Sequence, residues 1–223
     1  SGQNLDDLGG KLEAVGGKLN SAGNTLIGLS APILAFAGYA TKAGIDFEQG
    51  MAKVQAISGA TGSELQALTN KAKEIGESTQ WSSSQAAEGL QYLSMAGWDT
   101  KSMLAGITPI VNLATASTEN LGTVSDIVSD ALTAFGLSAK DTTEFCDVLA
   151  ATMANSNTNV AMLGETFQYA APLAGALGFS MQDVATAAGL MANAGIKASV
   201  SGTALRTLFA NMSEKIELTG QAF

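Results

Sequence analysis

The stretch WSSSQAAEGLQYLSMAG, residues 81–97, carries the clearest structural signal, because FSMQDVATAAGLMANAG at residues 179–195 repeats its pattern at an offset of 98 residues. In both, an apolar residue precedes a serine, an amide or acid follows three residues later, and a glycine closes the stretch. Together these features predict a capping box at the start of a helix and a left-handed glycine at its end. A third, partial copy begins at Leu137. The predicted capping residues are Ser82, Gln85, Gly97, Ser138, Asp141, Ser180, Asp183 and Gly195.

Similar short segments fill residues 59–223, each with one apolar face at helical spacing and with Ser, Thr, Asn or Gly at its ends. Alanine is abundant and aromatic residues make up only 6% of the chain, a composition that favours helix over sheet. The 25 glycines disfavour helix unless they lie at caps, at turns or at close contacts between helices. We therefore expect an all-α fold in which residues 59–223 form a module of repeated short helical hairpins.

Residues 1–58 have a different pattern, with apolar side chains that alternate at steps of three and four residues. A sustained heptad predicts one long helix, similar to a coiled-coil strand, whose apolar seam packs against another helix. Small residues follow the seam one place later, which favours close self-association. The heptad seam comprises Leu5, Leu8, Leu12, Val15, Leu19, Leu26, Leu29, Ile33, Phe36 and Phe47.

The composition argues against an enzyme. The chain has no histidine and one cysteine, Cys146, so it can form neither a His-assisted nucleophile, nor a His-ligated metal site, nor an internal disulfide. The carboxylates of Asp126 and Asp130, or of Asp141, Glu144 and Asp147, have helical spacing that suits an acid/base pair or a cation site. A solvated helix face has the same spacing and is the preferred interpretation. No catalytic residue, metal ligand or cofactor is predicted.

Charge and hydropathy limit the partners. The net charge of -9 disfavours binding to a phosphate backbone, so no specific nucleic acid is expected. Residues 19–41 carry no charge and are long enough to span a bilayer, although their Asn, Thr, Ser and Pro residues fit a buried bundle helix equally well. A membrane-active element therefore stays open as an alternative.

Several ordered motifs resemble the core region of phage tail tape-measure proteins over roughly residues 40 to 215. They are DFEQGMAKV at 46–54, TQWS at 79–82, LSMAG at 93–97, LMANAGIK at 190–197 and GTALR at 202–206. The resemblance implies a largely helical structural protein in the lumen of the tail tube, which sets tail length during assembly and is released during genome ejection. It also implies a virion location, with a stage in the host cytoplasm during assembly.

The heptad seam predicts further copies of the chain as partners, and the resemblance implies tail-tube and tail-tip proteins, tail-assembly chaperones and, on ejection, the host membrane. The chain is expected to be a fragment of a longer protein, with any lytic part outside it. Two rival functions remain: a membrane-active translocation or pore element in the host envelope, and a hydrolase that uses carboxylates alone. The hairpin module either stays compact at one end of the tail or opens into extended helices inside the tube.

Overall fold

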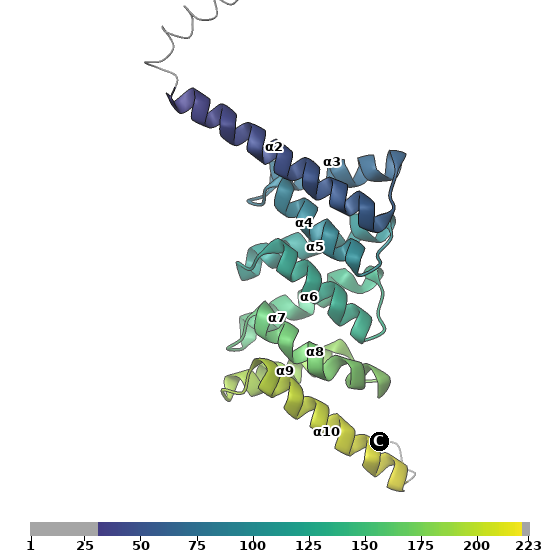
Figure 1. Ribbon diagram of the computed structural model, residues 1–223. Coiled ribbons are helices and arrows are strands. Elements are labelled where there is room, and N and C mark those ends of the chain that lie inside the picture. The colour runs from purple at the N-terminus through teal and green to yellow at the C-terminus, as the bar shows by residue number, and fades with distance from the viewer. Residues whose placement is uncertain (1–30, 220–223) are drawn as a thin grey trace, which may run out of the picture. The chain divides into compact units, whose positions relative to one another are not determined.

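The computed structural model describes residues 31–219, with side chains described for residues 42–213. Two units, Ser1–Asp46 and Phe47–Phe223, are considered separately. In the part of the chain described, all regular structure is helical, which confirms the all-α prediction (Figure 1). The helices are α2 (Ala31–Ser58), α3 (Gly62–Ser78), α4 (Ser83–Met95), α5 (Thr100–Ser117), α6 (Leu121–Ala134), the 3-10 turn η1 (Ala139–Asp141), α7 (Thr142–Asn155), α8 (Val160–Ala176), α9 (Met181–Asn193) and α10 (Ala198–Thr219).

Within the second unit the helices form two rows. Helices α4, α6, α8 and α10 make one row, and α3, α5, α7 and α9 make the other, so that each helix packs against the helix two places along the chain. Figure 1 shows the successive pairs stacked from α3 to α10. This arrangement is that of an α-solenoid, in which each repeat contacts mainly its neighbours.

The repeating unit is a pair of helices. Helices α4, α6, α8 and α10 begin at residues 83, 121, 160 and 198, which are spaced by 38, 39 and 38 residues. The 98-residue offset found in the sequence instead relates α4 to α9, which belong to different rows. The shared capping box therefore marks how a helix begins, and not its place in the repeat.

A compact joint connects α4 to α5, α6 to α7 and α8 to α9. In the first joint Gly97 adopts a φ of 81°, and the Trp98 N–H donates to the Leu93 carbonyl at 3.1 Å. This is a Schellman ending, in which a left-handed residue satisfies carbonyls that the helix leaves free. Gly136 and Gly178 end their helices in the same way. Since Asp99, Ser138 and Ser180 begin the next segment two residues later, each joint reverses the chain within a few residues.

The capping residues predicted from the sequence occupy helix termini. Both halves of a capping box are present at Ser82 with Gln85, at Ser138 with Asp141 and at Ser180 with Asp183. In each box the serine N–H donates to the side chain three residues later at 2.9 Å. The bond from the Ser138 N–H holds the pKa of Asp141 below the ordinary value of 3.8, and the bond from the Ser180 hydroxyl, followed by that from the Ser180 N–H, does the same for the pKa of Asp183. Gly195, with a φ of 86°, ends α9.

The core lies between the two rows. It consists of aliphatic side chains and a few aromatic ones, such as the fully buried Phe145 and Phe167, whose ring centroids are 5.5 Å apart. Trp81 is buried, and its indole N–H donates to the Thr115 hydroxyl at 2.9 Å. Every buried side-chain nitrogen and oxygen in the described part has a hydrogen-bond partner. A core whose buried polar groups all have hydrogen-bond partners favours a single packing arrangement.

Neighbouring helices of the α4–α10 row approach closely at one repeated point, where the seventh residue of one helix meets the fifth residue of the next. A Cβ on Gly89 would lie 2.9 Å from the Ser125 hydroxyl, and one on Gly164 would lie 2.9 Å from Cγ1 of Ile127. A Cβ on Gly202 would lie 2.7 Å from the Thr166 carbonyl oxygen. One glycine in each pair therefore makes the spacing between adjacent helices possible.

Most residues of the heptad seam precede the part of the chain whose side chains the structure describes. Leu5, Leu8, Leu12, Val15, Leu19, Leu26 and Leu29 lie outside the described residues, while Ile33 and Phe36 fall within α2 without described side chains. Phe47 is partly buried and packs against the core of the second unit, with Lys73 Nζ 5.8 Å from its ring centroid. Met51 and Val54, further along α2, are also buried in that core.

Substitution of Gly202 tests the close approach between α8 and α10. Gly202→Ala should destabilise the chain by about 1–3 kcal/mol, because the added methyl group meets backbone atoms that cannot rotate away. Chemical denaturation followed by circular dichroism measures the change. Gly44→Ala is the matched control, because a Cβ at Gly44 has no atom within 4 Å, and alanine there should be neutral or stabilising by roughly 0.5–1 kcal/mol. Equal effects of the two substitutions would contradict the close approach.

The capping carboxylates predict a loss of stability in acid. The folded-state pKa values of Asp141 and Asp183 are lowered, so their contribution is present above 3.8, the unfolded value, and is lost as the pH falls through the folded-state pKa. Replacing both residues by Asn should flatten the dependence of unfolding free energy on pH below about pH 4. Denaturant titrations of both chains from neutral to acidic pH check this. An unchanged slope in the double variant would rule out the capping carboxylates as its source.

Candidate functional site

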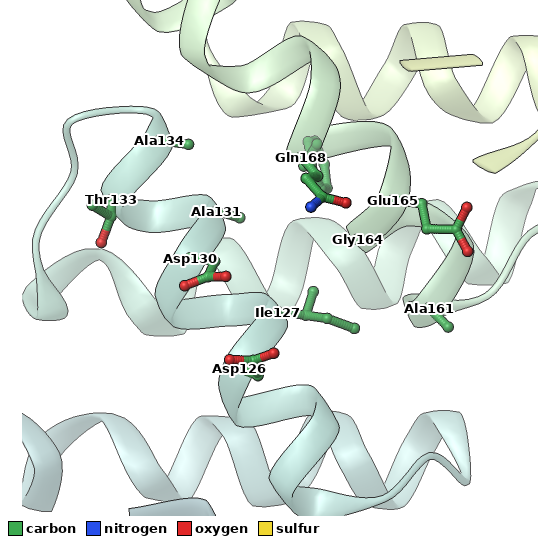
Figure 2. Close-up of a pocket in the computed structure, with 11 residues that line it drawn as sticks. Asp126, Ile127, Asp130, Ala131, Thr133, Ala134, Ala161, Gly164, Glu165 and Gln168 are labelled. Atoms are coloured by element: carbon green, nitrogen blue, oxygen red, sulfur yellow. The ribbon is translucent and has the colours of Figure 1, made fainter. Parts of the chain in front are cut away.

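The groove between α6 and α8 contains the carboxylate pair that the sequence singled out. It has a volume of about 510 Å³ and is drawn in Figure 2. Its polar side chains include Asp126 and Asp130 from α6 and Glu165 and Gln168 from α8, while Ile127 and Gly164 meet where the two helices are closest. The groove therefore follows from the packing of two adjacent repeats.

The carboxylates of this groove do not converge on one point. Figure 2 shows Glu165 turned away from Asp126 and Asp130. Burial, with a smaller contribution from Asp130, raises the pKa of the Asp126 carboxyl. Within the described residues, no group of three or more Asp, Glu or Cys side chains is arranged to hold a metal ion. The groove brings the predicted pair together, its lining holds no Cys, Lys or Arg side chain, and its one hydroxyl, on Thr133, donates to the Ser129 carbonyl at 2.9 Å.

The second carboxylate cluster separates into different roles. Asp141 closes the capping box ahead of α7, while Glu144 accepts a 2.6 Å hydrogen bond from the Gln182 amide of the neighbouring helix α9. Cys146 lies between Glu144 and Asp147 in the sequence, but its side chain is buried. Burial, followed by the Asp147 charge, raises the pKa of Cys146 to about 12. The thiol is therefore protonated near neutral pH and is a poor nucleophile.

The structure also identifies contact residues that the sequence analysis did not single out. These are the fifth and seventh residues along α4, α6, α8 and α10, including Gly89, Gly164 and Gly202. A glycine in the middle of an otherwise regular helix was the available signal, because it costs helix stability unless another backbone approaches. The apolar exposed surface of α10, with Val200 66% and Leu208 52% exposed, was missed as well.

None of the described helices combines the length and the hydropathy needed to cross a bilayer. The uncharged run at 19–41 falls largely outside the described residues.

The chain is similar to known phage tail proteins. The phage-related minor tail protein family matches residues 69–223. The chain is 34% identical over 178 residues to the tape measure protein of Pneumococcus phage Dp-1, an alignment that covers 80% of this chain and 16% of that protein. It is 27% identical over 182 residues to the probable tape measure protein of Escherichia phage P2, covering 81% of this chain and 22% of that protein. No solved structure has significant similarity to the chain.

The chain thus spans between about a sixth and a quarter of the length of these relatives. The family match covers more than half of the chain, including most of the helix stack, and agrees with the motifs at 79–82, 93–97, 190–197 and 202–206. The chain therefore belongs to the phage-related minor tail protein family, as a region of the tape-measure type.

Proposed function

We propose that this chain is a non-enzymatic structural region of a tape-measure protein, which takes part in setting tail length and leaves the tail during genome ejection. The observation that supports this most strongly is the helix stack, in which buried residues fill contacts and the candidate carboxylates do not converge. The family match supports the same conclusion. A protein that occupies space needs defined contacts, and a hydrolase needs a convergent set of reactive groups.

Different parts of the chain suit different roles in a ruler. A helix rises 1.5 Å per residue, so the heptad segment would contribute length in direct proportion to its number of residues. Adjacent packed helices are only about 8–10 Å apart, so a stacked pair of some 39 residues adds little length. Left-handed glycines such as Gly97 and Gly136 also interrupt any continuous helix through the stack. We therefore propose that the stack stays packed and that the heptad segment extends along the tube.

We place the start of the packed module at Phe47 instead of residue 59. Met51 and Val54 are buried in the core of the second unit, and Gly50 lies against Ala87 of α4. The heptad segment would then end near Asp46. This assignment keeps the heptad seam for contacts between copies and gives the last turns of α2 to the stack.

The proposed partners follow from this division. Further copies of the chain would associate through the heptad seam, since several parallel rods fit within one tube. Tail-tube and tail-tip proteins would surround the rods, and tail-assembly chaperones would cover apolar surface before the tube forms. The virion is the proposed final location, with a cytoplasmic stage during assembly.

Tail length measured by electron microscopy tests the proposed ruler. Deletion of residues 9–36 removes 28 residues while keeping the heptad register, and should shorten the tail by about 42 Å. Deletion of residues 120–158 removes one repeat of the stack, and should shorten the tail by no more than about 10 Å, the spacing of packed helices.

The two deletions are controls for each other. Shortening by about 60 Å on removal of the stack repeat, the length of 39 residues in a continuous helix, would show that the stack opens inside the tube. Unchanged tail length after removal of residues 9–36 would contradict the assignment of the ruler to the heptad segment.

Sedimentation tests the heptad seam. The full chain should form oligomers, whereas a chain restricted to residues 47–223 should form a smaller species, because it lacks every seam residue except Phe47. A full-length variant with Leu12→Asp and Leu26→Asp keeps the chain length and should also dissociate, because a buried charge is costly in an apolar seam. Equal stoichiometry in all three chains would remove the proposed role of the seam.

A further inference from the structure

Helix α10 is the last helix of its row in the described part of the chain, and no described helix covers the face of α10 that matches the faces buried earlier in the row. Counted from the first residue of each helix, the seventh residue is Gly89 in α4, Ile127 in α6, Thr166 in α8 and Ala204 in α10. The first three of these contact the fifth residue of the next helix. Ala204 is exposed. By position in the repeat, Ala204 is the centre of a surface that receives a helix.

The surroundings of Ala204 agree with that assignment. Val200 and Thr207 lie one turn to either side of Ala204, and Thr203 directly precedes it. All three are exposed and line a shallow open depression along α10. The sixth residue is acidic in the occupied helices, as Glu88, Asp126 and Glu165, but in α10 it is Thr203. The free face is therefore less polar than the faces that are already covered.

A helix that terminates a solenoid normally has a polar outer face, because no further repeat covers it. Between residues 198 and 213, α10 has a single charged side chain, Arg206, and exposes Val200 and Leu208. Helix α10 therefore has the composition of an internal repeat and not that of a cap.

The residue at the fifth position of each helix also indicates which kind of helix can pack against α10. The fifth residues of α4, α6, α8 and α10 are Ala87, Ser125, Gly164 and Gly202, all of them small. Ala204 is small, but its Cβ occupies space that a glycine would leave free, so the residue facing it must also be small. A close approach at Ala204 would therefore suit a helix with glycine, alanine or serine at its fifth position.

We propose that the α10 face formed by Val200, Thr203, Ala204 and Thr207 is the docking surface for a further helix pair of the same repeat, contributed by a longer tape-measure polypeptide. The relatives, of whose length this chain spans 16% and 22%, have ample chain to supply it. The contact would continue the α4–α6–α8–α10 interface in the same register. This inference is independent of whether the protein sets tail length.

Cysteine labelling tests the proposal. Cys146 is buried and its raised pKa keeps it unreactive, so an introduced Ala204→Cys reports on the α10 face alone. Its rate of reaction with iodoacetamide should fall by at least about tenfold in the intact tape-measure polypeptide relative to the chain of residues 1–223, because the packed helix must open before the thiol is exposed. Gln66→Cys on the exposed surface of α3 is the control and should react equally fast in both.

A second variant guards against a general effect of chain length on the labelling rate. Ala204→Trp should lower the melting temperature of the intact polypeptide and leave that of the 1–223 chain unchanged, because the bulky ring has a neighbour only in the former. Equal labelling rates of Ala204→Cys in the two proteins would overturn the proposal. Protection that appears in the 1–223 chain as its concentration rises would assign the face to a second copy, and would also overturn it.

Discussion

The close approach of neighbouring helix backbones is the constraint on which the stack depends. Each step of the α4–α10 row brings a fifth and a seventh residue together, and one member of each pair is glycine. At Gly202 the neighbouring atoms are the backbone of Thr166 and Cβ of Tyr169, none of which moves with a rotamer change, so no such change can create room for a side chain. The helix propensity lost at such a glycine is about 1 kcal/mol, and it is offset by packing along the whole helix.

The sequence predicted the helical class and the caps because both depend on short-range chemistry. Ser82 with Gln85 and Ser180 with Asp183 satisfy backbone N–H groups within three residues, so neighbours in the chain are sufficient to identify them. The two-row arrangement was not predicted, because it depends on contacts between residues 36 or 37 positions apart, such as Gly164 with Ile127. The 98-residue offset was misleading for the same reason, since α4 and α9 share a cap but not a row.

The candidate site was predicted only in part. Asp126 and Asp130 do lie in one groove, as their spacing requires, but the sequence could not show that Glu165 points elsewhere. Asp141 and Glu144 share one helix start in the sequence and serve different contacts in the structure. The absence of histidine and the buried Cys146 limit the available chemistry.

The central claim is that side chains in this chain are arranged for close contact between repeats, and a double-mutant cycle on Ile127 and Gly164 tests it most directly. Gly164→Ala should destabilise the folded chain by about 1–3 kcal/mol, because the new methyl group meets the Ile127 side chain. In an Ile127→Ala background the same change should become neutral or stabilising, because room is available and alanine favours the helix. Additive effects of the two substitutions would contradict the account.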